Sequence, residues 1–279
     1  MVRRNIKLSM PELPEVETTC RGIAPYVEGK HVHSIIVRQA KLRWPIPLSL
    51  HELEGKKILS VTRCAKYILL QSTHGCAILH LGMSGSLRII DASLVAEKHD
   101  HIDIVLCTGK AIRLRDPRRF GAVLWTRDNP LEHKLLSKLG LEPLSDAFTA
   151  KFLYKMSRKR RVSVKQFIMN AQIVVGVGNI YASESLFMAG ISPKVTAANL
   201  SLARYQKLVD CIKNVLTSAI EQGGTTLRDF IQVEGKPGYF QQQLNVYSRA
   251  GEKCNTCNTL IKKITQGQRS SFYCPLCQK

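Results

Sequence analysis

The 279-residue sequence has no apolar run long enough to span a bilayer, and its basic first nine residues lack the apolar stretch of a secretory signal. It also lacks a spaced cysteine framework. The nine cysteines are odd in number, and five of them are scattered, mostly inside apolar segments. We therefore expect free thiols and a reducing, cytoplasmic compartment rather than a secreted or membrane protein.

Acidic residues are scarce: 21 Asp and Glu stand against 41 Lys and Arg, a formal net charge of +20. Such an excess suits a polyanionic partner, because Lys and Arg that neutralise phosphates release condensed counterions. Charge alone leaves open a generally basic protein without such a partner. Hydrophobic residues make up 44% of the chain, enough for real cores, and the length allows two ordinary domains and a small appendage.

The first half of the chain has the pattern of short strands. Residues 15–23 favour a helix that stops before Pro25, and residues 131–139 begin helical character that marks a linker. Turn signals such as Thr108-Gly109-Lys110 separate the runs between them, which predicts an antiparallel sandwich or barrel. The β-branched runs cover residues 31–37, 58–62, 67–70, 77–81, 87–90, 102–107, 111–114 and 122–126.

From Lys151 onward the apolar period becomes helical. Ser201 is a candidate N-cap and Gly223-Gly224 a stop for the clearest helix. Its apolar stripe at i, i+3, i+4 and i+7 spacing consists of Leu202, Tyr205, Leu208, Ile212, Val215, Leu216 and Ala219.

The C-terminal tail carries two Cys-x2-Cys pairs, Cys254/Cys257 and Cys274/Cys277, with sixteen residues between them. Each pair can place two thiolates on one turn, and two pairs complete a tetrahedral zinc site. Four cysteines fill the coordination sphere, so the predicted single zinc ion is structural and folds a short hairpin.

Residues 151–165 contain seven basic residues and no acid, and a glycine turn over residues 174–179 leads directly into a helical segment. The basic run alone could be a solvated face, and the turn could serve packing only. Together, exposed N–H groups at a helix start and the Asn179 amide indicate a phosphate cradle. The glycine spacing does not fit a dinucleotide-binding fingerprint.

Taken in order over residues 11–279, nine short stretches resemble the bacterial formamidopyrimidine-DNA glycosylases, which repair oxidised purines. The stretches are PELPEVET (11–18), AKY (65–67), HLGMSGSL (80–87), KHDH (98–101), DPRRFG (116–121), VGVGNIYASES (175–185), QGGTT (222–226), GKPGYF (235–240) and FYC (272–274).

The resemblance implies an α+β multidomain fold with an N-terminal β-sandwich, a helix–two-turns–helix domain and a C-terminal β-hairpin zinc finger. It also implies a monomer that binds double-stranded DNA containing oxidised bases, near the nucleoid. The predicted boundaries are a leader over residues 1–10 that is absent from the active enzyme, a catalytic sandwich over 11–130, a linker over 131–150, a helical DNA-binding domain over 151–240 with a lesion-capping loop over 223–239, and the zinc finger over 244–279.

The resemblance assigns catalysis to four residues. Pro11, as a free secondary amine, would attack the sugar C1′ and expel the base, and Glu12 would act as general acid. A free α-amine titrates near ~8, against roughly 10.4 for lysine, so far more of it is unprotonated at neutral pH. Lys66 would assist the first elimination, and Arg269 would assist the second while also gripping phosphate.

The resemblance also names the DNA contacts. Met83, Arg118 and Phe120 would fill the gap that an extruded base leaves in the duplex. For Met83 and Phe120, core packing is the reading that the residues alone would favour. The remaining predicted contacts are His99, Arg160, Lys165, Asn179 and Arg269. Arg228 departs from the lysine familiar in this family.

Three other functions fit parts of the sequence. Endonuclease VIII uses the same proline chemistry on oxidised pyrimidines, but that family begins Pro-Glu-Gly-Pro-Glu, whereas this chain has Leu13. A non-catalytic lesion-binding protein would follow if the leader kept Pro11 acylated. A zinc-containing transcription regulator lacks support, because no recognition helix with a dimer interface is visible in the sequence.

Overall fold

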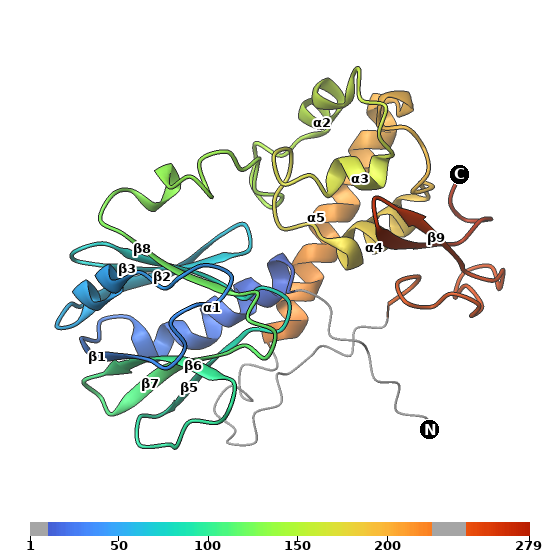
Figure 1. The fold of residues 1–279 in the computed structure, drawn as a ribbon. Coiled ribbons are helices and arrows are strands. Elements are labelled where there is room, and N and C mark those ends of the chain that lie inside the picture. The colour runs from blue at the N-terminus through green and yellow to red at the C-terminus, as the bar shows by residue number, and fades with distance from the viewer. Residues whose placement is uncertain (1–10, 225–243) are drawn as a thin grey trace. The chain divides into compact units, whose positions relative to one another are not determined.

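The computed structural model describes residues 11–224 and 244–279, which form two compact units (Figure 1). The first runs to Ser137 and also includes the end of the chain's longest helix from Gln222, and the second runs from Lys138 to Glu221 and includes the C-terminal residues from 244. The predicted leader over residues 1–10 and most of the predicted capping loop, including Arg228, lie outside the described residues. Within the described ranges, no helix is both long and apolar enough to cross a membrane.

The first unit is a sandwich of two antiparallel four-stranded sheets with one helix, α1 (Leu13–Val27). One sheet has the order β1-β6-β7-β5 and the other β2-β3-β4-β8. The strands are β1 (Val32–Val37), β2 (Ile58–Cys64), β3 (Tyr67–Ser72), β4 (Cys76–His80), β5 (Ser86–Asp91), β6 (Asp100–Leu106), β7 (Lys110–Arg115) and β8 (Ala122–Thr126), and the short 3-10 helices are η1 (Leu48–Leu53) and η2 (Pro130–Glu132). The predicted sandwich is therefore confirmed.

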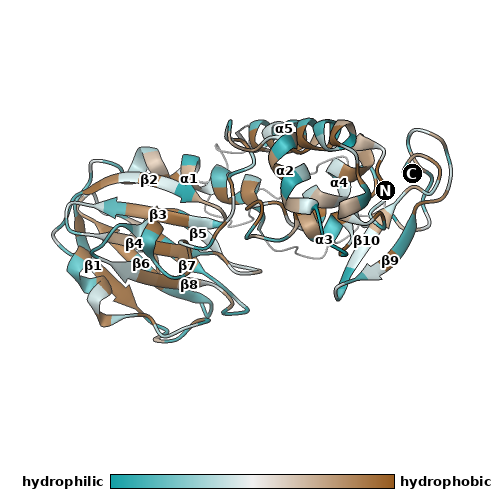
Figure 2. Ribbon diagram, turned by 90° about the horizontal axis from the view of Figure 1, so that it is seen from above, coloured by the Kyte–Doolittle hydropathy of each residue, from teal (hydrophilic) through white to brown (hydrophobic). Residues whose placement is uncertain are grey.

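Apolar residues of α1 and of both sheets meet in one core. Every residue of β6 is buried, whereas β1 and β2 turn only part of their residues inward. Figure 2 shows the corresponding hydrophobic colouring along the strands. Burial of these side chains is what makes short, β-branched segments persist as strands.

The predicted end of the first helix is wrong. The helix α1 continues through Pro25 to Val27, because Val27 is fully buried in the sandwich core. A proline in a helix leaves the carbonyl four residues earlier without its N–H donor. That residue is Arg21, which is exposed, so water can satisfy its carbonyl group.

The second unit is helical and carries the cysteine tail. Thr149 caps α2 by accepting from the Phe152 N–H group, and Ser163 caps α3 by accepting from the Gln166 N–H group. The elements are α2 (Ala150–Ser157), α3 (Val164–Ile168), α4 (Asn179–Ala189), η3 (Ala197–Asn199), α5 (Leu202–Gly224), β9 (Lys262–Gln266) and β10 (Arg269–Tyr273). Residues 131–139, predicted to begin a helix, contain only the end of η2.

Two helices organise the core of this unit. In α5 the predicted stripe is confirmed at Tyr205, Leu208 and Ile212, which are fully buried, whereas Leu202 is 42% exposed. Figure 2 shows the alternating bands along this helix. The helix α4 is different, since most of its residues are buried and it ends at Gly190 in the left-handed conformation.

The strands β9 and β10 form a hairpin whose two turn residues, Gly267 and Gln268, both have positive φ angles of 52° and 59°. That geometry is the primed turn whose twist matches paired strands. It places Arg269 at the first position of β10. The finger has a small core of its own, which includes Phe187 from α4.

Candidate active site and nucleic-acid interface

The predicted nucleophile and acid sit at the start of α1. Pro11 is buried, and Glu12, at the N-cap position, is only 2% exposed. The backbone N–H group of Glu12 donates to Glu15 Oε2 at 2.8 Å. Glu15 therefore helps fix the chain direction at the point where Pro11 would have to present its nitrogen.

Lys66 lies in a two-residue turn between β2 and β3, where Ala65 has a φ angle of 54°. Arg63 donates from Nη1 to the Ala65 carbonyl at 2.8 Å and from Nε to Glu17 Oε2, on α1, at 2.9 Å. Burial would raise the pKa of Glu17, but hydrogen bonds from Arg21 and Arg63 outweigh it and lower that pKa. The turn that carries Lys66 is thus tied to the helix that begins beside Pro11 and Glu12.

His80 lies at the end of β4, within the stretch HLGMSGSL, and the structure gives its imidazole a defined state. Its Nδ1 atom accepts from the Gly82 N–H group at 2.9 Å, and its ring centroid lies 4.9 Å from that of Tyr67. Burial first, and then the positive charges of Lys66 and Arg43, lower the pKa of His80 to about 4. The imidazole is therefore neutral at pH 7, with its proton on Nε2.

The three predicted gap-filling residues come from two neighbouring loops of the sandwich. Phe120 is 46% exposed, Arg118 is exposed and Met83 is half-buried, so Phe120 and Met83 are not part of the core. The Arg118 guanidinium lies 5.0 Å from the centroid of the Phe120 ring. The loops are joined by the Ser84 hydroxyl, which donates to Asp116 Oδ1 at 2.7 Å.

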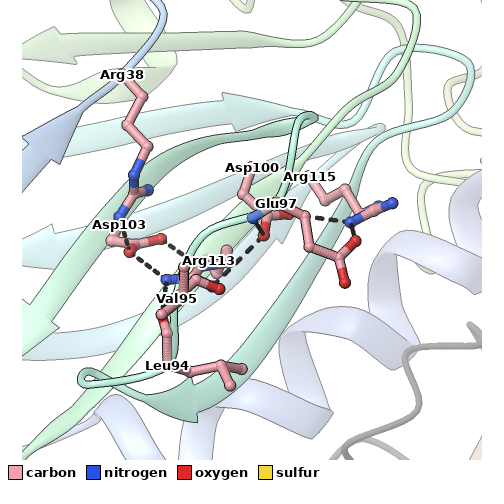
Figure 3. A network of polar contacts seen from close by, with 8 residues as sticks. All are labelled: Arg38, Leu94, Val95, Glu97, Asp100, Asp103, Arg113 and Arg115. Atoms are coloured by element: carbon pink, nitrogen blue, oxygen red, sulfur yellow. Dashed lines mark hydrogen bonds and ion pairs between the residues drawn. The ribbon is translucent and has the colours of Figure 1, made fainter.

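His99 lies in the segment that leads into β6, and a buried ion-pair network fixes that segment to the sheet (Figure 3). Arg113 donates to both carboxylate oxygens of Asp103 at 2.8 Å, and also to the carbonyl groups of Leu94 and Val95. Since Arg113 and Asp103 are both almost fully buried, this pair holds the approach to His99 firmly.

In the helical unit, the segment predicted to cradle phosphate leads into the start of α4, where Gly178 is the N-cap. Lys165 is 2% exposed and donates to Asn179 Oδ1 at 2.6 Å, to Ser271 Oγ at 2.8 Å and to the Ser270 carbonyl at 3.1 Å. The buried Lys165 ammonium of α3 therefore links α4 and β10 through these hydrogen bonds. This geometry does not place it as an exposed phosphate contact; it positions Asn179 instead.

Arg269 is exposed beside this lysine, and both line a small open pocket with Gln166, Met169, Gln266, Gly267 and Ser271. Arg160 is exposed just beyond α2. An arginine at the rim and N–H groups at a helix start together suit an anionic oxygen. The second unit thus brings Asn179 and Arg269 to one place, with Lys165 between them.

The four tail cysteines meet as predicted, with all four Sγ atoms within 4.8 Å of one another. The Cys254–Cys277 and Cys257–Cys274 sulfur pairs are 3.9 and 3.4 Å apart. Tetrahedral zinc with ~2.3 Å bonds needs sulfur atoms about 3.8 Å apart, so the residues fit the ion. Hydrogen bonding by Thr259 lowers the pKa of Cys257. Burial raises the pKa of Cys274, whereas the neighbouring sulfur atoms and burial raise the pKa of Cys277.

The fold and these sites define a class of protein: a nucleic-acid-binding protein with a β-sandwich, a helical domain and a four-cysteine zinc finger. Three family models match the chain. They are the formamidopyrimidine-DNA glycosylase N-terminal domain over residues 10–123, the formamidopyrimidine-DNA glycosylase H2TH domain over 139–231, and the zinc finger found in FPG and IleRS over 251–279.

The chain is also similar to known proteins over nearly its whole length. The chain is 57% identical over 271 residues to the formamidopyrimidine-DNA glycosylase of Pseudomonas aeruginosa, covering 97% of this chain and 100% of the relative. A Lactococcus lactis FPG mutant in complex with a Fapy-dG containing DNA matches with a TM-score of 0.87 and 32% identity, covering 96% of this chain and 100% of the other. The MutM (FPG) protein of Thermus thermophilus matches with a TM-score of 0.83 and 34% identity, covering 96% and 98%. The chain belongs to the formamidopyrimidine-DNA glycosylase family, which consists of DNA glycosylases with AP lyase activity.

Proposed function

We propose that this protein excises oxidised purines such as 8-oxoguanine and formamidopyrimidines from duplex DNA, and then nicks the strand by β- and δ-elimination. Family membership over nearly the whole chain supports the reaction class. The observation that carries the assignment is local: Pro11 and Glu12 are buried at the start of α1, and Glu17 and Arg63 tie that helix to the Lys66 turn. A monomer in the cytoplasm, at the nucleoid, is part of the same proposal.

The proposed chemistry starts at the Pro11 nitrogen, whose lone pair forms a bond to the sugar C1′. The bond from C1′ to the base breaks, and the base leaves with the electron pair of that bond and takes up the proton that the Pro11 nitrogen loses. Glu12 protonates the ring oxygen, so that the sugar opens to an iminium.

Loss of a C2′ proton from the iminium then expels the 3′ phosphate. A second elimination expels the 5′ phosphate. We place Lys66 at the first elimination and Arg269 at the phosphate of the second.

The remaining site residues have binding roles in this proposal. Met83, Arg118 and Phe120 fill the gap left by the extruded base, and His99, Arg160 and Asn179 contact the DNA, with Lys165 behind Asn179. One zinc ion held by Cys254, Cys257, Cys274 and Cys277 stabilises the finger that presents Arg269.

The sharpest test compares a free and an acylated nitrogen at Pro11. A chain that begins at Pro11 is compared with one in which residues 1–10 are retained, so that the same nitrogen is an amide. Borohydride reduction during reaction with an 8-oxoguanine:cytosine duplex should trap a covalent adduct only with the free amine. Equal trapping by both forms would overturn the proline assignment, and intact mass of protein from its own cell should show the start at Pro11.

The choice of substrate has its own experiment. Excision of 8-oxoguanine opposite cytosine should exceed excision of thymine glycol, since the family models matched are those of the oxopurine enzymes. The reverse order would support the oxidised-pyrimidine specificity of the rival family. Tight binding of lesion DNA by the Pro11 form without any adduct would favour a non-catalytic lesion-binding protein.

A further inference from the structure

The loop between β4 and β5, residues 81–85, and the loop between β7 and β8, residues 116–121, interlock backbone to backbone. Gly82 has a φ angle of +64°, and a Cβ atom added there would lie 2.4 Å from the Phe120 carbonyl carbon and 2.5 Å from the Gly121 nitrogen. A Cβ added at Gly121 would lie 2.8 Å from the His80 carbonyl oxygen. Only glycine permits this approach, so the two loops share one packed surface.

A buried carboxylate fastens the same two loops. Asp116 is fully buried, and its Oδ1 atom accepts from the Ser84 hydroxyl at 2.7 Å and from the Arg118 N–H group at 3.3 Å. Its Oδ2 atom accepts from the Gly121 N–H group at 2.7 Å. The Arg118 N–H group also lies 3.2 Å from Ser84 Oγ, which closes the ring of contacts. One side chain thus reaches Ser84, beside Met83, and both ends of the Arg118–Phe120 segment.

The main chain of Asp116 is fixed in turn to the sheet. His101 Nε2 lies 2.8 Å from the Asp116 carbonyl oxygen, and the Asp116 N–H group donates to the His99 carbonyl at 3.0 Å. The Arg43 N–H group donates to the Gly121 carbonyl at 3.0 Å. The Asp116 carboxylate therefore holds both loops against a backbone segment that is itself hydrogen-bonded to the sandwich.

We propose that Asp116 is a positioning residue, and that its bond to Ser84 locks the Met83 loop and the Arg118–Phe120 loop into one rigid body. The inference rests on the proposed gap-filling role of Met83, Arg118 and Phe120. The three side chains then enter the duplex in one concerted step rather than as separately mobile groups. Because their loops are ordered before DNA arrives, the entropy of ordering them is not lost at the moment of base extrusion.

The first test removes the two Ser84 hydrogen bonds that join the loops and leaves the other contacts of the Asp116 carboxylate. Ser84→Ala deletes the hydroxyl, while Asp116 keeps the Arg118 and Gly121 N–H groups. Base extrusion is followed by the fluorescence of 2-aminopurine placed next to 8-oxoguanine. We expect roughly tenfold slower extrusion, the size of one hydrogen bond to a charged group. Ser93→Ala, in an exposed loop of the same unit, is the matched control and should match the parent protein.

A second substrate separates positioning from general damage to the fold. A preformed abasic site has no base to extrude, so strand cleavage there by Ser84→Ala should stay within about twofold of the parent rate. Similar losses on both substrates, or a loss accompanied by unfolding of the sandwich, would show a merely structural role. Because extrusion is read by fluorescence, the lock is tested even if the proposed excision itself is absent.

The decisive measurement is the coupling between the two loops. Met83→Ala, Phe120→Ala and the double variant are compared in the parent protein and in the Ser84→Ala background. A locked body predicts that, in the parent, the double variant slows extrusion little more than the worse single variant. In the Ser84→Ala background the two effects should multiply. Independent effects in both backgrounds, or unchanged extrusion in Ser84→Ala, would overturn the proposal.

Discussion

Among the described residues, the core of the β-sandwich has 24 buried members drawn from α1, both sheets and the loops between them. The core of the zinc finger has five, of which two are metal-binding cysteines and one, Phe187, belongs to α4. A core of the first size can hold a domain together by burial alone. The second cannot, so the finger depends on its metal and on the helix beneath it.

The two units also use buried acids differently. In the sandwich, the Asp116 carboxylate accepts hydrogen bonds from Ser84 and Gly121, which lie in two neighbouring short loops. In the helical unit, Glu184 on α4 is 4% exposed and accepts from the N–H groups of Asn245, Val246 and Tyr247 at 2.8 to 3.0 Å. That carboxylate fastens the first part of the finger to α4, as an anion does in a nest of backbone donors. The comparison separates a sandwich that burial alone can stabilise from a zinc finger that depends on its metal and on α4.

Metal removal should produce the largest difference between the units. Cys254→Ser, or a strong chelator, should unfold the finger, since structural zinc contributes about 10–16 kcal/mol of apparent binding free energy in such sites. The sandwich should keep its own unfolding transition. Amide hydrogen exchange read separately over residues 262–273 and 100–115 makes the measurement, with Cys107→Ser, an exposed cysteine of the sandwich, as control. Equal loss of protection in both regions would contradict the comparison.

Glu184→Ala should have the next largest effect. Removing this carboxylate leaves buried N–H groups without an acceptor, and we expect about 3 kcal/mol of lost stability in the helical unit. Urea denaturation of the full chain gives the change, and exchange of the Val246 and Tyr247 amides locates it. Glu221→Ala, on an exposed position of α5, should change stability by less than about 0.5 kcal/mol. A similar loss for both variants would refute the anchoring role.

Acid should instead weaken the sandwich, through His80. Burial lowers the pKa of His80 from 6.5 to about 4, so between these values the unfolded chain binds more protons than the folded one. Stability should therefore fall as the pH drops from 6.5 to 4, by up to about 3 kcal/mol. His80→Phe should flatten this part of the stability curve of the sandwich. An unchanged slope would show that His80 is not the group responsible.

A helix cap should give the smallest effect. Thr149→Ala removes the acceptor for the Phe152 N–H group at the start of α2, and caps of this kind contribute about 1 kcal/mol. Thermal unfolding of the helical unit is the measurement. Thr265→Ala, exposed on β9, should be nearly silent by comparison. A larger loss from Thr265→Ala than from Thr149→Ala would contradict this ranking.

The features that the sequence predicts correctly depend on local patterns. The short β-branched strands, the apolar stripe of α5 and the cysteine spacing are properties of neighbouring residues, and the structure confirms all three. The predicted end of α1 is wrong, because the burial of Val27 outweighs the tendency of Pro25 to end a helix. Propensity is a weak prior where tertiary packing decides.

The contacts between side chains at the site could not be predicted from local patterns. Lys165 belongs to a run of basic residues, but in α3 it follows the buried Val164 and precedes the buried Phe167, so it points inward with them. The bond between Ser84 and Asp116 joins residues 32 positions apart, and no local signal announces it. The neutral state of His80 depends on burial and on the positive charges of Lys66 and Arg43, which only the fold brings together.

The anchoring of the finger to α4 has a consequence for the order of assembly during synthesis. Glu184 and Phe187 are made about sixty residues before the Asn245–Tyr247 segment that binds this carboxylate. The partners of the Lys165 ammonium, Ser270 and Ser271, are made later still, more than 100 residues after it. The sandwich can therefore fold while the rest of the chain is being made, whereas the Lys165 contacts with Ser270 and Ser271 form only after the second strand of the hairpin has been made. The surroundings of Asn179, which Lys165 also contacts, are thus completed by the last residues of the chain.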